Sequence, residues 1–168
     1  MQGAAIEAGS VVGIRYIVYR LSSGAYFKYS SGGKPVFLWS LGYGNEGQDD
    51  VGDLYTFTLG VTGDLPRAVP SALVGMRKGG RRRVLVPPQL GWTDDSMRPR
   101  PITFGAKRRL VQHRDEPLLF EAEVVAVYPP GSDEANDALQ RAFDVSRREA
   151  AFRLPLPKPL TAPKSVAE

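Results

Sequence analysis

The chain contains no cysteine, which excludes disulfide bonds, thiol chemistry and cysteine-ligated metal sites. Histidine is nearly absent as well, since His113 is the only one. No serine, cysteine or carboxylate accompanies it in a pattern typical of a catalytic triad or a zinc site. Asp49 and Asp50 lack the alternating oxygen ligands of a calcium loop, so both are expected at the surface. The sequence therefore predicts no metal site and no cofactor.

Long hydrophobic runs are missing too. No apolar stretch approaches the roughly 20 residues that cross a bilayer, so no transmembrane segment is expected. No segment resembles a secretory signal or an organelle transit peptide. What is present is a globular composition, with 42% hydrophobic and 24% charged residues in 168, enough for one domain and an extension. A net charge of +4, largely from arginine, favours acidic partners without choosing among proteins, lipid headgroups and nucleic acid.

Hydrophobic alternation and turn signals predict a series of short strands. Their expected ranges are 11–21, 25–29, 36–41, 54–59, 82–86 and 118–128. A two-turn helix is expected over 65–74, since Pro66 and Pro70 fit a first helical turn and Gly75 ends it. The stretches 42–52 and 93–116 are expected to be loops. Together these elements predict an α+β domain, an antiparallel sheet of five to six strands wrapped around one short helix.

The Pro129-Pro130-Gly131 turn is expected to end this domain, so that residues 1–130 form the domain and 131–168 a C-terminal extension. A helix is predicted from about 133 to 153, followed by an extended Pro-rich tail. The helix carries a narrow apolar stripe, formed by Leu139, Ala142, Phe143, Ser146 and Ala150. This stripe could pack on its own domain or on a partner. We expect helix and tail to dock on a partner.

Two motifs carry a family resemblance. Residues 55–60 read Tyr-Thr-Phe-Thr-Leu-Gly, and residues 75–92 run from Gly-Met-Arg through a Gly-Gly turn to Val-Pro-Pro-Gln-Leu-Gly-Trp. Their order and spacing resemble the FKBP-type peptidyl-prolyl cis-trans isomerases, over roughly residues 12–128. The chain looks most similar to the plastid FKBP-like proteins of plants and algae. The resemblance implies an apolar pocket for proline between sheet and helix, with a proline-containing polypeptide as its ligand.

Carried over residue by residue, the resemblance implies which side chains form that pocket. The matching positions are Phe27, Tyr55, Phe57, Asp64, Leu65, Pro66, Val69, Trp92 and Phe120. Asp64 and Leu65 occupy the place of the pair whose backbone meets the ligand. The chain departs from the family at Lys28, where an Asp is usual, and at Val69, where the pocket floor is usually Trp. The pocket tyrosine of the first strand is Tyr16 or Tyr19, depending on a one-residue register.

Prolyl isomerisation needs no nucleophile or metal, only a pocket that binds the twisted imide better than the planar one. Exchanging Trp for Val could forfeit a few kcal/mol of apolar contact, hence about tenfold to a thousandfold in affinity. Our leading hypothesis is therefore an FKBP-like domain with a degraded pocket, acting mainly as a scaffold or assembly subunit of a larger plastid complex in the thylakoid lumen or stroma. The alternative is an active isomerase that assists protein folding.

A third hypothesis rests on two arginine-rich segments, 77–83 and 98–109. Clustered arginines can neutralise nucleic-acid phosphates, which would make the protein an RNA-associated factor. No aromatic signature of RNA binding accompanies them. We therefore expect solvated surface or contact with an acidic partner at these segments.

Overall fold

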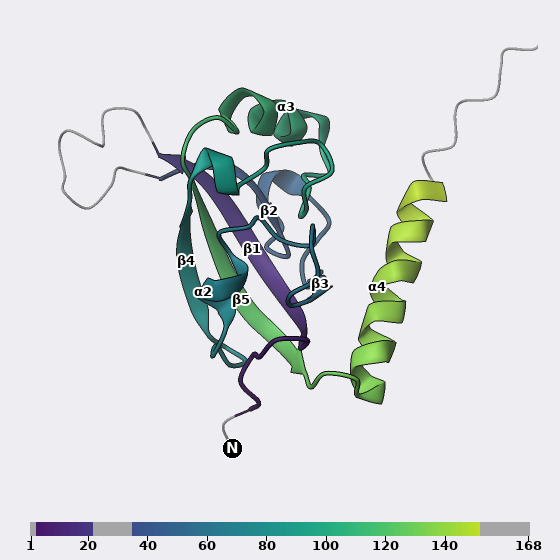
Figure 1. The fold of residues 1–168 in the computed structure, drawn as a ribbon. Coiled ribbons are helices and arrows are strands. Elements are labelled where there is room, and N and C mark those ends of the chain that lie inside the picture. Colours follow the sequence, from purple (N-terminus) through teal and green to yellow (C-terminus); the bar gives the residue numbers. More distant parts are fainter. Residues whose placement is uncertain (1–2, 22–34, 152–168) are drawn as a thin grey trace, which may run out of the picture.

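The computed structural model describes residues 3–21 and 35–151, which form a curled sheet with short helices and a long C-terminal helix (Figure 1). The strands are β1 (Val11–Leu21), β2 (Pro35–Leu41), β3 (Tyr55–Thr58), β4 (Arg81–Val86) and β5 (Leu118–Tyr128). The helices are η1 (Asn45–Gly47), α2 (Pro70–Leu73), η2 (Pro88–Leu90), α3 (Phe104–His113) and α4 (Asp133–Ala151). The strand expected at 25–29 and the Pro-rich tail lie outside the described residues.

The sheet is built around β1. Along one side β1 pairs with β5 over nearly its whole length, and β5 pairs in turn with β4. The other side of β1 is shared, because β3 pairs with Val11–Ile14 and β2 with the half that begins at Tyr16. All these pairings are antiparallel. The predicted α+β class with a five-stranded antiparallel sheet is therefore confirmed.

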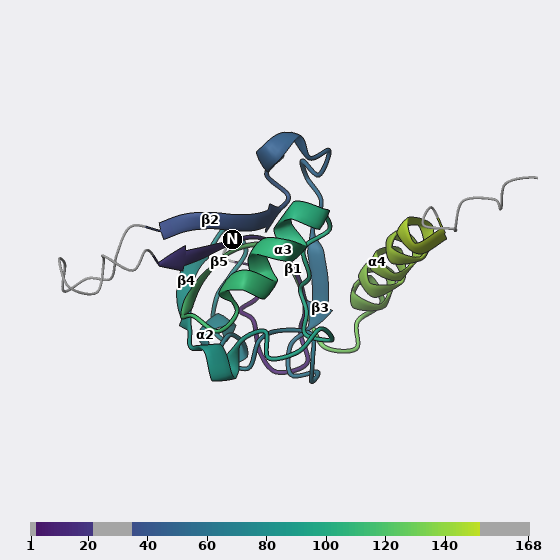
Figure 2. The same ribbon diagram turned by 90° about the horizontal axis from the view of Figure 1, so that it is seen from above.

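One face of the sheet forms the core. Since side chains alternate along a strand, every second residue of β1 and β5 points the same way. The residues on this face are buried, namely Val12, Ile14, Tyr16, Val18, Leu118, Phe120, Ala122 and Val124. Leu73 of α2 and Ala106 of α3 close over them, each with none of its surface exposed. Figure 2 shows α3 lying across the curled sheet in this view.

The helices differ from the prediction in two places. α2 has only a single turn, because the residues before Pro70 form turns. The expected loop at 93–116 contains α3, and the loop assignment was wrong there. Thr103 caps this helix, since its Oγ1 accepts a hydrogen bond from the Ala106 amide at 3.2 Å. Ala106 and Leu110, one turn apart, pack against the core and hold the helix to the sheet.

The loop after β2 is held by a buried carboxylate. Asp50 is only 4% exposed and accepts hydrogen bonds from the amides of Gly42 and Gly44, at 3.0 and 2.7 Å. The expectation that Asp50 lies at the surface was wrong, whereas Asp49 is exposed. Gly42 has φ +95°, and a Cβ there would stand 2.6 Å from the Asp53 carbonyl oxygen, so this turn requires glycine.

On the opposite face of the sheet, Glu123 of β5 links its own strand to β1, to β4 and to the loop after β2. Its carboxylate meets the Arg15 and Arg81 guanidinium groups at 2.8 Å each and accepts a hydrogen bond from the Tyr43 hydroxyl at 3.1 Å. The hydrogen bond from Arg15, followed by that from Arg81, lowers the pKa of Glu123 to about 2. This carboxylate is therefore charged at neutral pH and ties β1, β4 and β5 together.

α4 covers residues 133–151, close to the predicted helix. Ser132 caps its start, accepting the Ala135 amide at 3.2 Å. Ala135 and Ala138 are buried against Val11 and Tyr128, while the later turns stand away from the sheet (Figure 1). Among the described helices, none combines the length and apolar character that a membrane crossing requires. The division into residues 1–130 and 131–168 stays a prediction.

Candidate functional site

Four aromatic rings line the core face where β1, β3 and β5 meet. Tyr16 stacks on Phe120 with ring centres 5.4 Å apart and meets the edge of Tyr55 at 6.2 Å. Tyr55 stacks in turn on Phe57 at 5.5 Å. Tyr16 is 2% exposed, and burial raises the pKa of its hydroxyl. The register of β1 thus turns Tyr16 toward the candidate pocket and Tyr19 toward the opposite face of the sheet.

Trp92 forms another side of the candidate pocket, and its side chain is only 1% exposed. Its indole N–H donates to the Pro99 carbonyl oxygen at 2.9 Å, and its ring meets the ring of Trp39 edge-on at 5.2 Å. Trp39, on β2, donates to the Tyr16 hydroxyl at 3.3 Å. Sequence reasoning missed Trp39, whose only signal was a tryptophan inside an apolar strand. The pocket tyrosine and the wall tryptophan are therefore both in contact with a side chain outside the predicted set.

The segment 93–116, which contains α3, packs against the same rings. Ala106 is fully buried in the cluster that holds Trp39 and Trp92, and Met97 and Leu110 pack against that cluster. Arg109 of α3 anchors the helix further, donating to the Leu38 carbonyl oxygen at 2.8 Å. This segment thus contributes to the core beside the predicted pocket and does not form a free loop around it.

The segment from Asp64 to Val69 forms the remaining edge. The Tyr55 hydroxyl donates to the Asp64 carbonyl oxygen at 2.6 Å, which occupies one backbone acceptor of the predicted ligand-binding pair. Pro66 has no N–H to offer. Leu65 and Pro66 are buried, and Val69 has no exposed surface. This edge therefore lacks an N–H donor at Pro66, and the Asp64 carbonyl oxygen already accepts a hydrogen bond within the protein.

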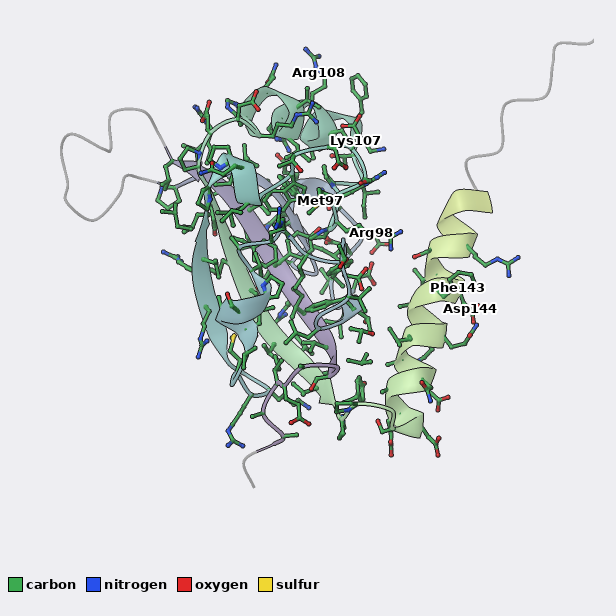
Figure 3. All side chains as sticks on the ribbon, in the orientation of Figure 1. Met97, Arg98, Lys107, Arg108, Phe143 and Asp144 are labelled. Atoms are coloured by element: carbon green, nitrogen blue, oxygen red, sulfur yellow. The ribbon has the colours of Figure 1, made fainter. Side chains whose placement is uncertain are left out.

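Two hollows adjoin these residues. A groove of about 870 Å³ separates β3 from α4 and is lined by Tyr55, Phe57, Asp64, Arg98, Ile102 and Phe143, among others. Figure 3 shows Arg98 on the side of the body that faces α4. Four members of the predicted apolar stripe line the groove, namely Leu139, Ala142, Phe143 and Ser146. A smaller cavity of about 240 Å³ lies between Trp92 and α3.

The nine predicted pocket residues therefore do not line one common pocket. Tyr55, Phe57 and Asp64 line the groove and Trp92 lines the smaller cavity. Leu65, Pro66, Val69 and Phe120 are buried and line neither of these hollows. Phe27 lies outside the described residues, as does Lys28. Within 3–21 and 35–151, no three His, Cys, Asp or Glu side chains gather in a way that could hold a metal ion.

Comparisons with known proteins bear on the family. The model of the FKBP-type peptidyl-prolyl cis-trans isomerases matches residues 3–125. From Arabidopsis thaliana, the chloroplastic peptidyl-prolyl cis-trans isomerase FKBP16-1 is 41% identical over 64 residues, covering 38% of this chain and 31% of that protein. The chloroplastic FKBP19 is 32% identical over 141 residues, covering 70% and 54%.

The chain thus spans between about a third and about a half of the length of these relatives. Among solved structures, a peptidyl-prolyl cis-trans isomerase from Pseudomonas syringae pv. tomato superposes with a TM-score of 0.41 at 21% identity, over 76% of this chain and 68% of the other. The family match extends over most of the described sheet, from the bridge before β1 into β5. This chain belongs to the FKBP-type peptidyl-prolyl cis-trans isomerase family.

Proposed function

We propose that this FKBP domain has a closed, degraded prolyl pocket and serves mainly as a scaffold or assembly subunit of a larger plastid complex. The observation that carries the proposal is the burial of the matched pocket side chains. Phe57, Val69, Trp92 and Phe120 are each at most 2% exposed. A prolyl ring can be bound only where a concave apolar surface is open to it, and Phe57 and Trp92 expose almost none of their surface to the two hollows that they line.

The contacts around Trp92 also support the proposal that the prolyl pocket is closed. Widening the cavity of about 240 Å³ beside Trp92 to take a prolyl ring would disturb its contact with Trp39 or its hydrogen bond to Pro99. It would also move α3, whose Ala106 is fully buried at this place. A substrate would have to break these contacts before it could bind. The free energy this costs would offset most of the binding that could favour the twisted imide.

The scaffold part of the proposal rests on the groove between β3 and α4. The stripe of α4 faces this groove, but beyond Ala138 the helix leaves it open, with Phe143 57% exposed and Val145 53%. A segment of a partner protein in the groove would bury the stripe and the β3 side chains together. In this proposal residues 1–130 are the domain and 131–168 the docking extension. The chloroplastic relatives support a plastid location.

Membership of the family favours one alternative, an active isomerase assisting protein folding. We do not propose the RNA-associated role. Arg81 and Arg83 lie on the sheet and pair with Glu123 and Glu121, whereas the second arginine-rich segment runs into α3 at one end of the body (Figure 1). These ion pairs give no support to a basic face shared by the two segments.

Isomerisation of an X-Pro tetrapeptide by the full chain tests the closed pocket. We expect catalysis at least tenfold weaker than that of an active FKBP-type isomerase assayed in parallel, corresponding to at least about 1.4 kcal/mol of lost transition-state binding. Tyr55→Ala and, as a matched control away from the pocket, Val61→Ala are assayed beside it. Strong turnover that Tyr55→Ala loses and Val61→Ala keeps would establish the isomerase alternative.

A truncation tests the scaffold separately. Residues 1–131 should keep the circular dichroism of the folded sheet but no longer migrate with a large complex in plastid extracts. The full chain should migrate with that complex. If the truncated chain still assembles, the extension is not the docking element.

A further inference from the structure

α3 has an outer face that is not packed into the core. Phe104, Lys107, Arg108 and Val111 follow one another at i, i+3, i+4 and i+7, which places them on one side of the helix. Ala106 and Leu110 lie on the other side, against the core. Phe104 is 75% exposed and Val111 56%, and Ile102 just before the helix is 45% exposed. We refer to Ile102, Phe104, Lys107, Arg108 and Val111 as the α3 outer face.

The cations of this face have no acidic partners. Within the described ranges, Lys107 and Arg108 form no salt bridge, and neither does the nearby exposed Arg100. Arg109, on the inner flank of the same helix, is by contrast paired with Glu46 at 2.6 Å. α3 contains no acidic residue. The face thus combines exposed apolar side chains with cations that form no salt bridge in the described residues, although Asp94 and Asp95 line the smaller cavity beside Lys107 and Arg100.

Apolar and charged side chains lie side by side on this face. The Arg108 guanidinium carbon lies 6.0 Å from the centre of the Phe104 ring, within the range of a cation–π contact. Figure 3 shows Lys107 and Arg108 at the end of the body where α3 lies. Because these side chains are exposed along one side of a helix, a partner surface that can deform around them suits the face best.

We propose that the α3 outer face docks on the surface of an anionic lipid bilayer. The bilayer interface accepts aromatic and aliphatic side chains of a helix lying in its plane, while anionic headgroups attract the cations beside them. Phe104, Ile102 and Val111 would enter the interface, and Lys107, Arg108 and Arg100 would meet the headgroups. Ile102 also lines the groove, so this site adjoins it, and it would hold the protein at a membrane as a peripheral, reversible contact.

Co-sedimentation with vesicles tests the proposal, using phosphatidylcholine alone or with about a third phosphatidylglycerol. We expect the full chain to bind only the anionic vesicles. Replacing both Lys107 and Arg108 with glutamine should weaken the partition coefficient about 25-fold, roughly fivefold for each cation. Phe104→Ala should weaken it about tenfold through lost apolar burial. Because these side chains are exposed, the variants should fold like the parent, as circular dichroism would verify.

The matched control replaces Arg67 and Lys78 with glutamine, two exposed cations near α2 with the same total charge change. It should keep binding within about twofold, because these residues are not on the docking face. Phe104→Trp gives an independent readout, since Trp39 and Trp92 are each 1% exposed and the new indole would be the one that enters the interface. We expect its emission to shift to the blue and to be quenched by brominated acyl chains.

Three results would overturn the proposal. Equal binding to neutral vesicles would remove the role of the cations, and an equal loss in the control would mean a diffuse attraction without a docking face. Binding to polyglutamate but not to anionic vesicles would identify an acidic protein as the partner in place of a membrane.

Discussion

Trp92→Ala should lower the free energy of unfolding by about 3–5 kcal/mol, the usual cost of emptying a buried aromatic position. The indole is 1% exposed, contacts the rings of Trp39 and Phe120, and donates to the Pro99 carbonyl oxygen. Its removal leaves a cavity and an acceptor without its donor. Urea unfolding followed by circular dichroism measures the change.

The matched control is Phe104→Ala, which removes an aromatic ring that is 75% exposed. Its effect should stay within about 0.5 kcal/mol. If Trp92→Ala costs less than about 1 kcal/mol, the indole is not part of the core, and an open prolyl pocket with Trp92 as its wall becomes the better description.

Glu123→Gln is expected to lower stability at neutral pH by roughly 1–3 kcal/mol, since it breaks two ion pairs and leaves Arg15 half-buried without its partner. The lower part of this range is the more relevant, because Arg81 is 57% exposed and solvent screens its pairing. The pKa of Glu123 is lowered in the folded protein from 4.5 to about 2. Between these pH values the unfolded chain binds the extra proton, so stability rises with pH.

The contribution of Glu123 is therefore complete above about pH 4.5 and is lost as the pH falls through about 2. Thermal unfolding from pH 7 down to pH 2 should show a steeper loss in the parent than in Glu123→Gln. Glu7→Gln, at an exposed carboxylate without an ion pair within the described residues, is the control and should follow the parent. Parallel pH curves for the parent and Glu123→Gln would contradict the role of this network.

The sequence predicted best where local pattern determines the structure. The limits of β1 and β5 coincide with their predicted ranges, because long alternating runs of apolar residues define both ends of a strand. α3 was missed because Pro99, Pro101 and Gly105 are typical of loops and hide a helix of only ten residues. The Thr103 cap followed by Ala106 and Leu110 was the available signal.

For the site, the sequence identified the aromatic residues that meet, but it did not identify the side chains that pack over them. Tyr16, Tyr55, Phe57 and Phe120 do meet in space, as the resemblance implied. The contact of Trp39 with Trp92 joins segments far apart in the chain, and no local pattern encodes it. The choice between Tyr16 and Tyr19 likewise depended on pairing with β5, a long-range property.

The most direct test of the closed pocket uses the two tryptophans, the only ones in the chain. With ¹⁵N-labelled tryptophan, an NMR spectrum should show two indole N–H resonances, both slow to exchange with solvent. Each is buried and donates a hydrogen bond, Trp92 to Pro99 and Trp39 to Tyr16. The account predicts that neither resonance moves when an X-Pro peptide is added. A saturable shift of the Trp92 resonance would show that the prolyl pocket opens to ligand and would contradict the account.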